Sequence, residues 1–132
     1  DEHLARHQHA DLFLDTFYYN AHTTASDALW AGVPVVTKMG QQFSSRVCGS
    51  LLNAVGLPEL ITNTDEDYEN LILKLAQAPD MLSGIKEKLY KNRLNCPLFD
   101  TKRYRDNFEN GLLRAYNIYF QGQQPMDLKI TE

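Results

Sequence analysis

The stretch from Asn20 to Asp27, Asn-Ala-His-Thr-Thr-Ala-Ser-Asp, holds the residue types best suited to chemistry in this chain. It follows an apolar run at residues 12–14 and precedes an amphipathic segment that ends at Gly32. Strand, polar loop and helix N-terminus together form the geometry in which α/β sheets hold phosphate, because free N–H groups and the helix dipole favour an anion there. The pattern predicts a site that could stabilise a diphosphate leaving group without a metal ion.

The same residues also fit a purely structural role. Threonine is a common N-cap, so Thr23 and Thr24 could do no more than begin a helix. Thr24 and Asp27 have the spacing of a capping box, and His22 could be a loop histidine without a ligand.

Apolar periodicity predicts the elements that position this loop. After a short helical piece at residues 1–9, we expect strands at 11–15, 33–37 and 59–61, and helices at 24–31, 44–55, 65–78, 83–93 and 101–121. Alternating strands and helices predict an α/β fold with a parallel sheet flanked by helices and a long C-terminal helix. We also expect Tyr90 to face inward, Trp30 to be in the core, and the aromatic residues of the last helix to be either core or a surface for a missing domain.

The predicted domain covers residues 1–121, and residues 122–132 are a polar tail. About three strands are visible where a doubly wound domain has about five or six, so the sheet is expected to be partial. The first residues, Asp-Glu-His-Leu-Ala-Arg, have neither an initiator Met nor a signal pattern, and we interpret them as a cut through a longer protein. An unpaired sheet edge would favour self-association.

Composition narrows the class of partner. A net charge of −4 argues against nucleic acid or an anionic membrane as the main partner, and no apolar run reaches the roughly 20 residues of a membrane span. Cys48 and Cys96 lack metal-ligand spacing and are expected to be free thiols of a cytoplasmic protein. His3 and His7 could share a helix face but lack a third ligand, so no metal site is predicted. Dinucleotide and P-loop fingerprints are absent.

Several motifs together resemble the C-terminal part of the O-linked N-acetylglucosamine transferase family, which includes the plant SPINDLY O-fucosyltransferases. The motifs are Leu14-Asp15-Thr16, the residues 20–24 with Asp27, the residues 29–37, Ser45-Arg46-Val47 and Pro97-Leu98-Phe99. The resemblance implies part of the second Rossmann-like domain of a GT-B glycosyltransferase. Members transfer a sugar from a nucleotide donor to Ser or Thr of proteins with inversion, and usually carry upstream tetratricopeptide repeats.

The resemblance also implies roles for individual residues. His22, Thr23 and Thr24 would contact the donor diphosphate, Asp27 the ribose, and His3 and Arg6 the base. It implies no metal cofactor and no catalytic residue within this chain, because the general base and the phosphate-binding lysines lie upstream. An isolated chain would then be inactive.

The donor is expected to be UDP-N-acetylglucosamine and the acceptors proteins, with an N-terminal GT-B domain as a partner. Two alternatives remain open: a protein O-fucosyltransferase that uses GDP-fucose, and a non-catalytic GT-B scaffold or interaction module. The departures from the family are Ala21 and Ala25, where Gly is frequent, and the loop 38–42, where relatives often have Pro-Gly-Glu. Alanine is less tolerant of positive φ than glycine.

Overall fold

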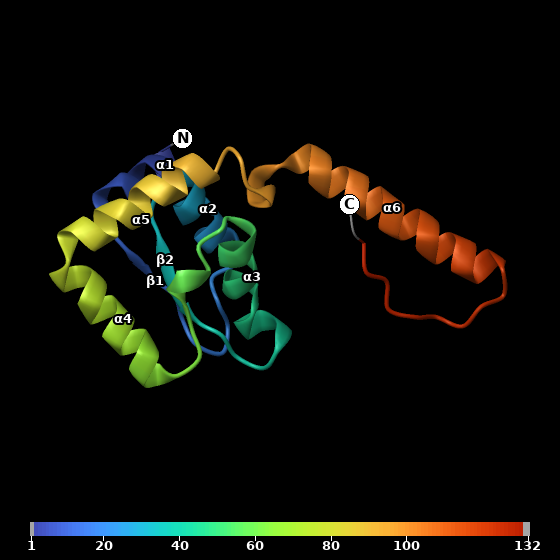
Figure 1. The fold of residues 1–132 in the computed structure, drawn as a ribbon, viewed down its shortest axis with the longest axis horizontal. Helices are drawn as coiled ribbons and strands as arrows, with labels where there is room; N and C mark the ends of the chain where they lie inside the picture. The colour runs from blue at the N-terminus through green and yellow to red at the C-terminus, as the bar shows by residue number, and fades with distance from the viewer. Residues whose placement is uncertain (1, 131–132) are drawn as a thin grey trace. The chain divides into compact units, whose positions relative to one another are not determined.

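The computed structural model describes residues 2–130, which belong to two compact units, Asp1–Leu98 and Phe99–Glu132. Figure 1 shows the chain from end to end. No helix within the described residues is long and apolar enough to span a membrane.

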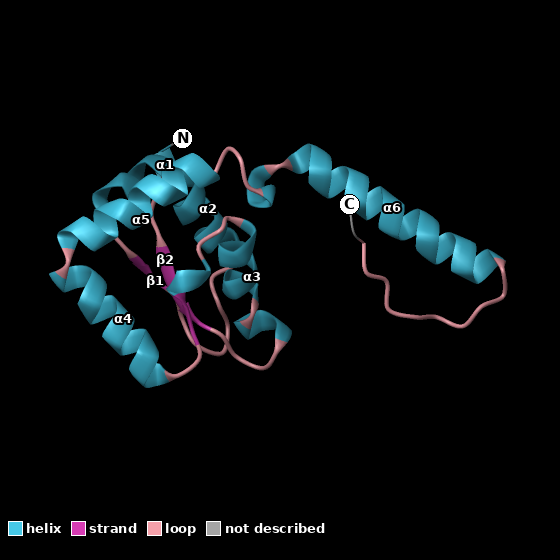
Figure 2. Cartoon of the chain, viewed as in Figure 1, coloured by secondary structure: helices cyan, strands magenta, loops and turns pink. Residues whose placement is uncertain are grey.

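The first unit alternates strands and helices, as the sequence predicts (Figure 2). Its strands are β1 (Phe13–Leu14), β2 (Val35–Lys38) and β3 (Ile61–Thr62). Its α-helices are α1 (Glu2–Ala5), α2 (Thr23–Ala31), α3 (Val47–Ala54), α4 (Asp65–Gln77) and α5 (Pro79–Asn92). Its short 3-10 turns are η1 (Arg6–His9), η2 (Phe43–Ser45) and η3 (Pro58–Leu60), and a fourth, η4 (Pro97–Phe99), includes the last two residues of this unit and the first of the next.

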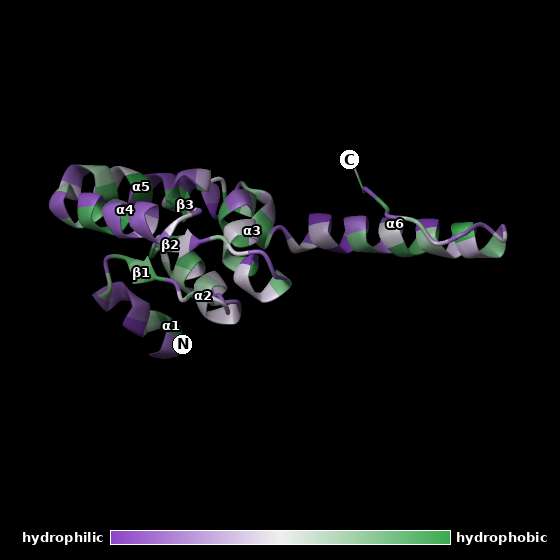
Figure 3. Ribbon diagram, turned by 90° about the horizontal axis from the view of Figure 1, so that it is seen from below, coloured by the Kyte–Doolittle hydropathy of each residue, from purple (hydrophilic) through white to green (hydrophobic). Residues whose placement is uncertain are grey.

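The sheet is parallel, with the strand order β1-β2-β3. Phe13 lies opposite Val35 and Thr37 lies opposite Ile61. Helix α4 packs on one side of the sheet with α5 beside it, and α2 packs on the other side with α1 beside it, while α3 also contacts β2 (Figure 3). This arrangement confirms the predicted α/β class with helices on both sides of a parallel sheet.

The core surrounds the central strand β2. Val35, Val36 and Thr37 are fully buried because helices cover both faces of this strand. The helices contribute fully buried side chains, among them Leu29, Leu52, Leu75 and Leu89. Helix α2 ends at Gly32, whose φ of 90° lies in the left-handed region where glycine is the favoured residue.

Several boundaries and packing predictions need correction. The strands are shorter than expected, and α5 begins at Pro79 rather than at Ser83, because proline is favoured in the first helical turn. Tyr90, predicted to face inward, is 63% exposed, and its ring lies against the Arg93 guanidinium. Trp30, predicted to be core, is also exposed.

The second unit contains α6 (Thr101–Phe120) and the segment after it. Polar and apolar residues alternate along α6 (Figure 3), and none of its residues is buried. The apolar side chains exposed on it are Tyr104, Phe108, Leu112, Leu113, Tyr116, Tyr119 and Phe120. The expectation that its aromatic residues form a core is therefore wrong, which leaves the expectation that they form a surface. Arg114 donates to the backbone carbonyl of Lys129 at 2.9 Å, which ties the following segment back to the helix.

Candidate functional site

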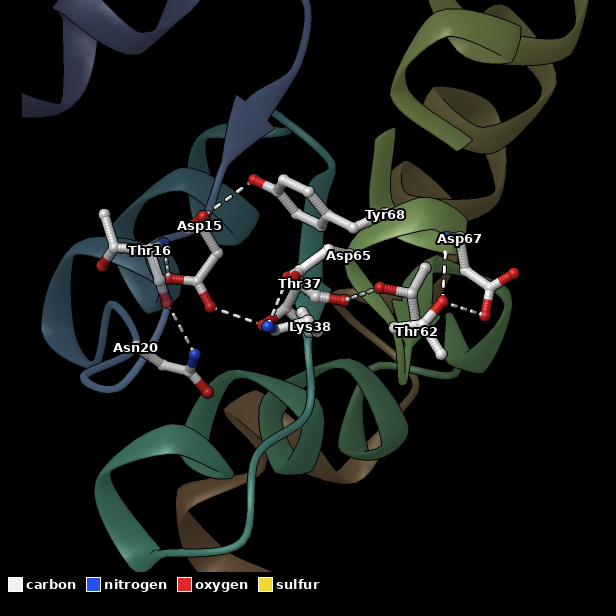
Figure 4. Close-up of polar contacts among 10 residues, drawn as sticks. Asp15, Thr16, Asn20, Thr37, Lys38, Thr62, Asp65, Asp67 and Tyr68 are labelled. Carbon is white, nitrogen blue, oxygen red and sulfur yellow. Dashed lines mark hydrogen bonds and ion pairs between the residues drawn. The ribbon is translucent and has the colours of Figure 1, made fainter. Parts of the chain in front are cut away.

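Asp15 fixes both ends of the loop that follows β1. Its Oδ1 accepts hydrogen bonds from the backbone N–H of Thr16 at 2.8 Å and of Ala21 at 2.6 Å. Its Oδ2 accepts from the hydroxyl of Thr37 on β2 at 2.5 Å, and its backbone carbonyl accepts from the phenol of Tyr68 on α4 at 2.7 Å (Figure 4). A buried carboxylate with this many donors sets the position of the whole loop.

Further contacts shape the loop itself. The Thr16 hydroxyl donates to the Tyr19 carbonyl at 2.7 Å, and the Asn20 amide donates to the Thr16 carbonyl at 3.0 Å. Tyr18 has a φ of 63°, the only positive value among the described non-glycine residues. Ser44, from a separate segment, stabilises the loop through two hydrogen bonds. Its hydroxyl donates to the Tyr18 carbonyl at 3.0 Å, and its carbonyl accepts from the Asn20 N–H at 2.8 Å.

The loop leads directly into the N-terminus of α2. His22 is the N-cap residue, and no side chain caps the helix. The first backbone hydrogen bond runs from the Ser26 N–H to the His22 carbonyl, so the N–H groups of the first turn lie outside the helical ladder. The predicted capping box of Thr24 and Asp27 is therefore wrong, because the helix begins one residue earlier and Asp27 bonds elsewhere.

A cavity of about 430 Å³ opens at this helix end. It is lined by residues of β1, the following loop and the first turn of α2, namely Phe13, Leu14, Asp15, Thr16, Tyr19, Asn20, Ala21, His22, Thr23 and Thr24. Three of the residues singled out in the sequence, His22, Thr23 and Thr24, thus share one cavity. An anion in it would face free N–H groups and the positive end of the helix dipole.

The remaining predicted site residues lie along α2 and the N-terminal turn. His3 Nε2 is 3.1 Å from Asp27 Oδ2, and the two side chains are 47% and 31% exposed. The structure therefore brings together residues that are 24 positions apart in sequence. Arg6 is exposed on η1, and no hydrogen bond or ion pair within residues 2–130 joins it to His3 or Asp27.

Sequence reasoning missed the residues that hold the site in shape. Four separate segments contribute these residues, which are Asp15, Thr37, Ser44 and Tyr68. In the sequence only Asp15 stood out, as an acidic residue at the end of an apolar strand. Burial, together with the charge of Asp15, raises the pKa of Tyr68. Burial also raises the pKa of the Cys48 thiol, which is free, as is Cys96.

A second cavity, about 390 Å³, lies beyond the ends of β1, β2 and β3. Lys38 lines it but is bound to Asp65 at 2.5 Å and lies 4.3 Å from the centre of the Phe17 ring. Within the described residues, no three His, Cys, Asp or Glu side chains gather in a way that could hold a metal ion.

Comparison with known proteins places these features in a family. The model of glycosyl transferase family 41 matches residues 1–108. The chain is 42% identical over 132 residues to a probable UDP-N-acetylglucosamine--peptide N-acetylglucosaminyltransferase SEC of Arabidopsis thaliana, covering 99% of this chain and 14% of that protein. It is 38% identical to the UDP-N-acetylglucosamine--peptide N-acetylglucosaminyltransferase of Caenorhabditis elegans, covering 96% of this chain and 11% of that protein.

A solved structure supports the same family assignment. The K341M mutant of the Thermobaculum terrenum O-GlcNAc transferase superposes with a TM-score of 0.81 at 34% identity, over 86% of this chain and 22% of that one. The match confirms the predicted fold class, a partial Rossmann-like domain of GT-B type. The chain spans only a small part of each of these relatives. With the family model matching most of its length, the chain belongs to glycosyl transferase family 41.

Proposed function

We propose that this chain is the nucleotide-sugar-binding part of an inverting protein O-glycosyltransferase that transfers N-acetylglucosamine from UDP-N-acetylglucosamine to Ser or Thr. One observation carries the proposal: His22, Thr23 and Thr24 line a cavity at the N-terminus of α2, and Asp27, one turn further along that helix, is paired with His3 of α1.

Each of these residues has a chemical role in the proposal. The Thr23 and Thr24 side chains, the first-turn N–H groups and His22 surround the diphosphate. The Asp27 carboxylate accepts hydrogen bonds from the ribose hydroxyls, and the His3 imidazole stacks on the flat base, with Arg6 near its edge. His3 is bound to Asp27 in this structure, so the ribose and base contacts would be made side by side.

The proposed reaction is a displacement at the anomeric carbon. The acceptor hydroxyl oxygen forms the new bond as the bond from that carbon to the diphosphate oxygen breaks, and the electron pair leaves with the diphosphate. The hydroxyl proton passes to a general base outside this chain. Hydrogen-bond donors already aimed at the leaving oxygen stabilise its growing charge, so the proposal requires no metal ion.

The proposal extends to the longer protein that carries this chain. The relatives' names describe transfer of N-acetylglucosamine to peptides, and the chain covers between 11% and 14% of the two described above. We therefore include in the proposal an upstream GT-B domain, upstream tetratricopeptide repeats and protein acceptors. The free cysteines support a reducing, cytoplasmic location.

The test is calorimetric titration of the full-length protein with UDP, GDP and their sugars, with a chelator and no divalent metal. We expect UDP to bind, and Thr24→Ala and Asp27→Ala to weaken it strongly. Ser26→Ala, on the same helical turn but outside the cavity lining, is the matched control and should bind as wild type. Preference for GDP would move the assignment to fucosyl transfer. Binding of neither nucleotide would refute the proposal in favour of a scaffold.

A further inference from the structure

The His22 ring is held by contacts from two separate loops. Tyr19 stacks on it with ring centres 4.7 Å apart and planes inclined by 17°. Phe43 meets it edge-on at 6.2 Å, and His22 Nε2 lies 3.3 Å from the carbonyl oxygen of Ser44. A histidine at the mouth of a helix N-terminus would otherwise be free to take several rotamers.

The contact with Ser44 also selects the protonated ring nitrogen. A carbonyl oxygen can only accept a hydrogen bond, so Nε2 of His22 carries the proton in this arrangement. Nδ1 is then the ring nitrogen that faces a ligand, and because a diphosphate oxygen only accepts, a contact from Nδ1 requires that this nitrogen also carries a proton. The orientation of the ring therefore decides which atom a bound diphosphate meets.

Tyr19 is held by its backbone, while its ring remains largely outside the core. Its carbonyl accepts from the Thr16 hydroxyl at 2.7 Å, and its N–H donates to the Phe17 carbonyl at 2.6 Å. The side chain is nevertheless 64% exposed and lines the same cavity as Thr23 and Thr24. A ring this exposed adds little to core packing, so the stacking on His22 is its main contact.

We propose that Tyr19 is a positioning residue for the donor diphosphate, acting by stacking on His22 and holding that ring in its binding orientation. This inference rests on the proposed function. It adds Tyr19 to the donor site as a residue that acts through His22 and not by touching the ligand itself. It requires the aromatic face of Tyr19 and does not require the hydroxyl.

A double-mutant cycle in the full-length protein tests this, with titration by UDP as the readout. Tyr19→Ala is expected to weaken UDP binding about three- to tenfold, the range for loss of one aromatic stacking contact. Tyr19→Phe keeps the ring and should bind within about twofold of wild type. In a His22→Ala background, Tyr19→Ala should have no further effect, because the residue on which it acts is absent.

Two controls separate positioning from folding. Tyr90→Ala removes a tyrosine of almost equal exposure, 63%, that stacks on Arg93 away from the cavity, and should leave UDP affinity unchanged. Tyr19→Leu retains apolar bulk without a ring face; it should unfold at the temperature of wild type and still bind UDP as weakly as Tyr19→Ala.

The possible outcomes are distinguishable. Wild-type affinity in Tyr19→Ala, or equal losses from Tyr19→Ala with and without His22, would overturn the positioning role while leaving the diphosphate site intact. Loss of affinity in Tyr19→Phe would also overturn it, because the ring face is kept. A wild-type protein that binds no UDP would refute the proposed function and this role together.

Discussion

Replacing Asp15 is expected to destabilise the first unit by an amount that depends on what replaces it. In Asp15→Asn the amide oxygen can still accept from the N–H groups of Thr16 and Ala21, and the new NH₂ can donate to the Thr37 hydroxyl oxygen. The geometry therefore survives and only the charge is lost. A hydrogen bond to a charged group contributes about 1 kcal/mol more than a neutral one, so the three bonds that become neutral give a loss of about 3 kcal/mol.

Asp15→Ala is expected to cost more, because it leaves two backbone N–H groups and one hydroxyl without their acceptor. Each unsatisfied donor costs about 1–3 kcal/mol, which gives about 4 kcal/mol in total when the loop relaxes partly toward water. That is a large share of the roughly 5–15 kcal/mol that stabilises a typical domain. About 1 kcal/mol shifts the melting temperature of a domain of this size by about 4–8 °C. Asp15→Asn, which loses about 3 kcal/mol, should therefore melt about 12–24 °C below wild type.

The assay is thermal unfolding of the purified chain followed by far-UV circular dichroism. Asp65→Asn is the control, since it also removes an acidic group with a close partner, Lys38, but its side chain is 78% exposed. An exposed ion pair contributes about 1 kcal/mol or less, so this variant should melt close to wild type. If Asp15→Asn is as damaging as Asp15→Ala, or if neither melts below Asp65→Asn, the bonding pattern assigned to Asp15 is wrong.

Three further predictions concern other residues. Asp27→Ala in the full-length protein should weaken UDP binding about 10- to 100-fold, which corresponds to the loss of one charge-assisted hydrogen bond or more. Its melting temperature should fall by no more than about 4 °C, because the pair with His3 is exposed. A large fall in melting temperature that accounts for the loss of UDP affinity would make Asp27 purely structural. The pKa of Tyr68 is raised above its ordinary value of 10.0, so the stability that the phenol contributes is complete below pH 10.0 and is lost as pH rises through the folded-state pKa. Unfolding free energies measured at increasing alkaline pH should show this loss. Tyr68→Phe should show a smaller loss at alkaline pH and should be about 1 kcal/mol less stable than wild type at neutral pH. Gly32→Ala should destabilise by about 1 kcal/mol because of its left-handed φ, whereas Gly84→Ala, inside α5 with open space around it, should stabilise by about 0.5–1 kcal/mol in urea unfolding; the same sign for both would contradict the conformational argument.

The parts of the fold that depend on local sequence could be predicted from it. Gly32 ends α2 as expected, and Thr64 caps α4 by accepting from the Asp67 N–H at 3.0 Å. Both signals act within a few residues of the chain. The start of α5 at Pro79 was missed although proline is itself a local signal, because the periodic apolar residues begin only later.

The contacts that shape the site join distant segments and could not be predicted in the same way. Asp15 meets Thr37 across 22 positions and Tyr68 across 53. The capping box failed for a related reason, because Asp27 pairs with His3 instead of the helix start. The spacing of residues in the sequence predicted which side chains lie at the helix N-terminus, whereas tertiary contacts determine how those side chains are oriented.

The charge balance of the cavity also indicates what a diphosphate needs from the rest of the protein. Asp15 lines the cavity, Asp27 lies one turn along α2, and the described lining includes no Lys or Arg. The helix N-terminus contributes only about half a positive charge, which cannot balance a diphosphate beside two carboxylates. Lys38 lines the second cavity but is already paired with Asp65. We therefore expect the cationic groups that complete the proposed donor site to come from outside the described residues, which is a physical reason for this chain to bind nucleotide weakly when it is isolated.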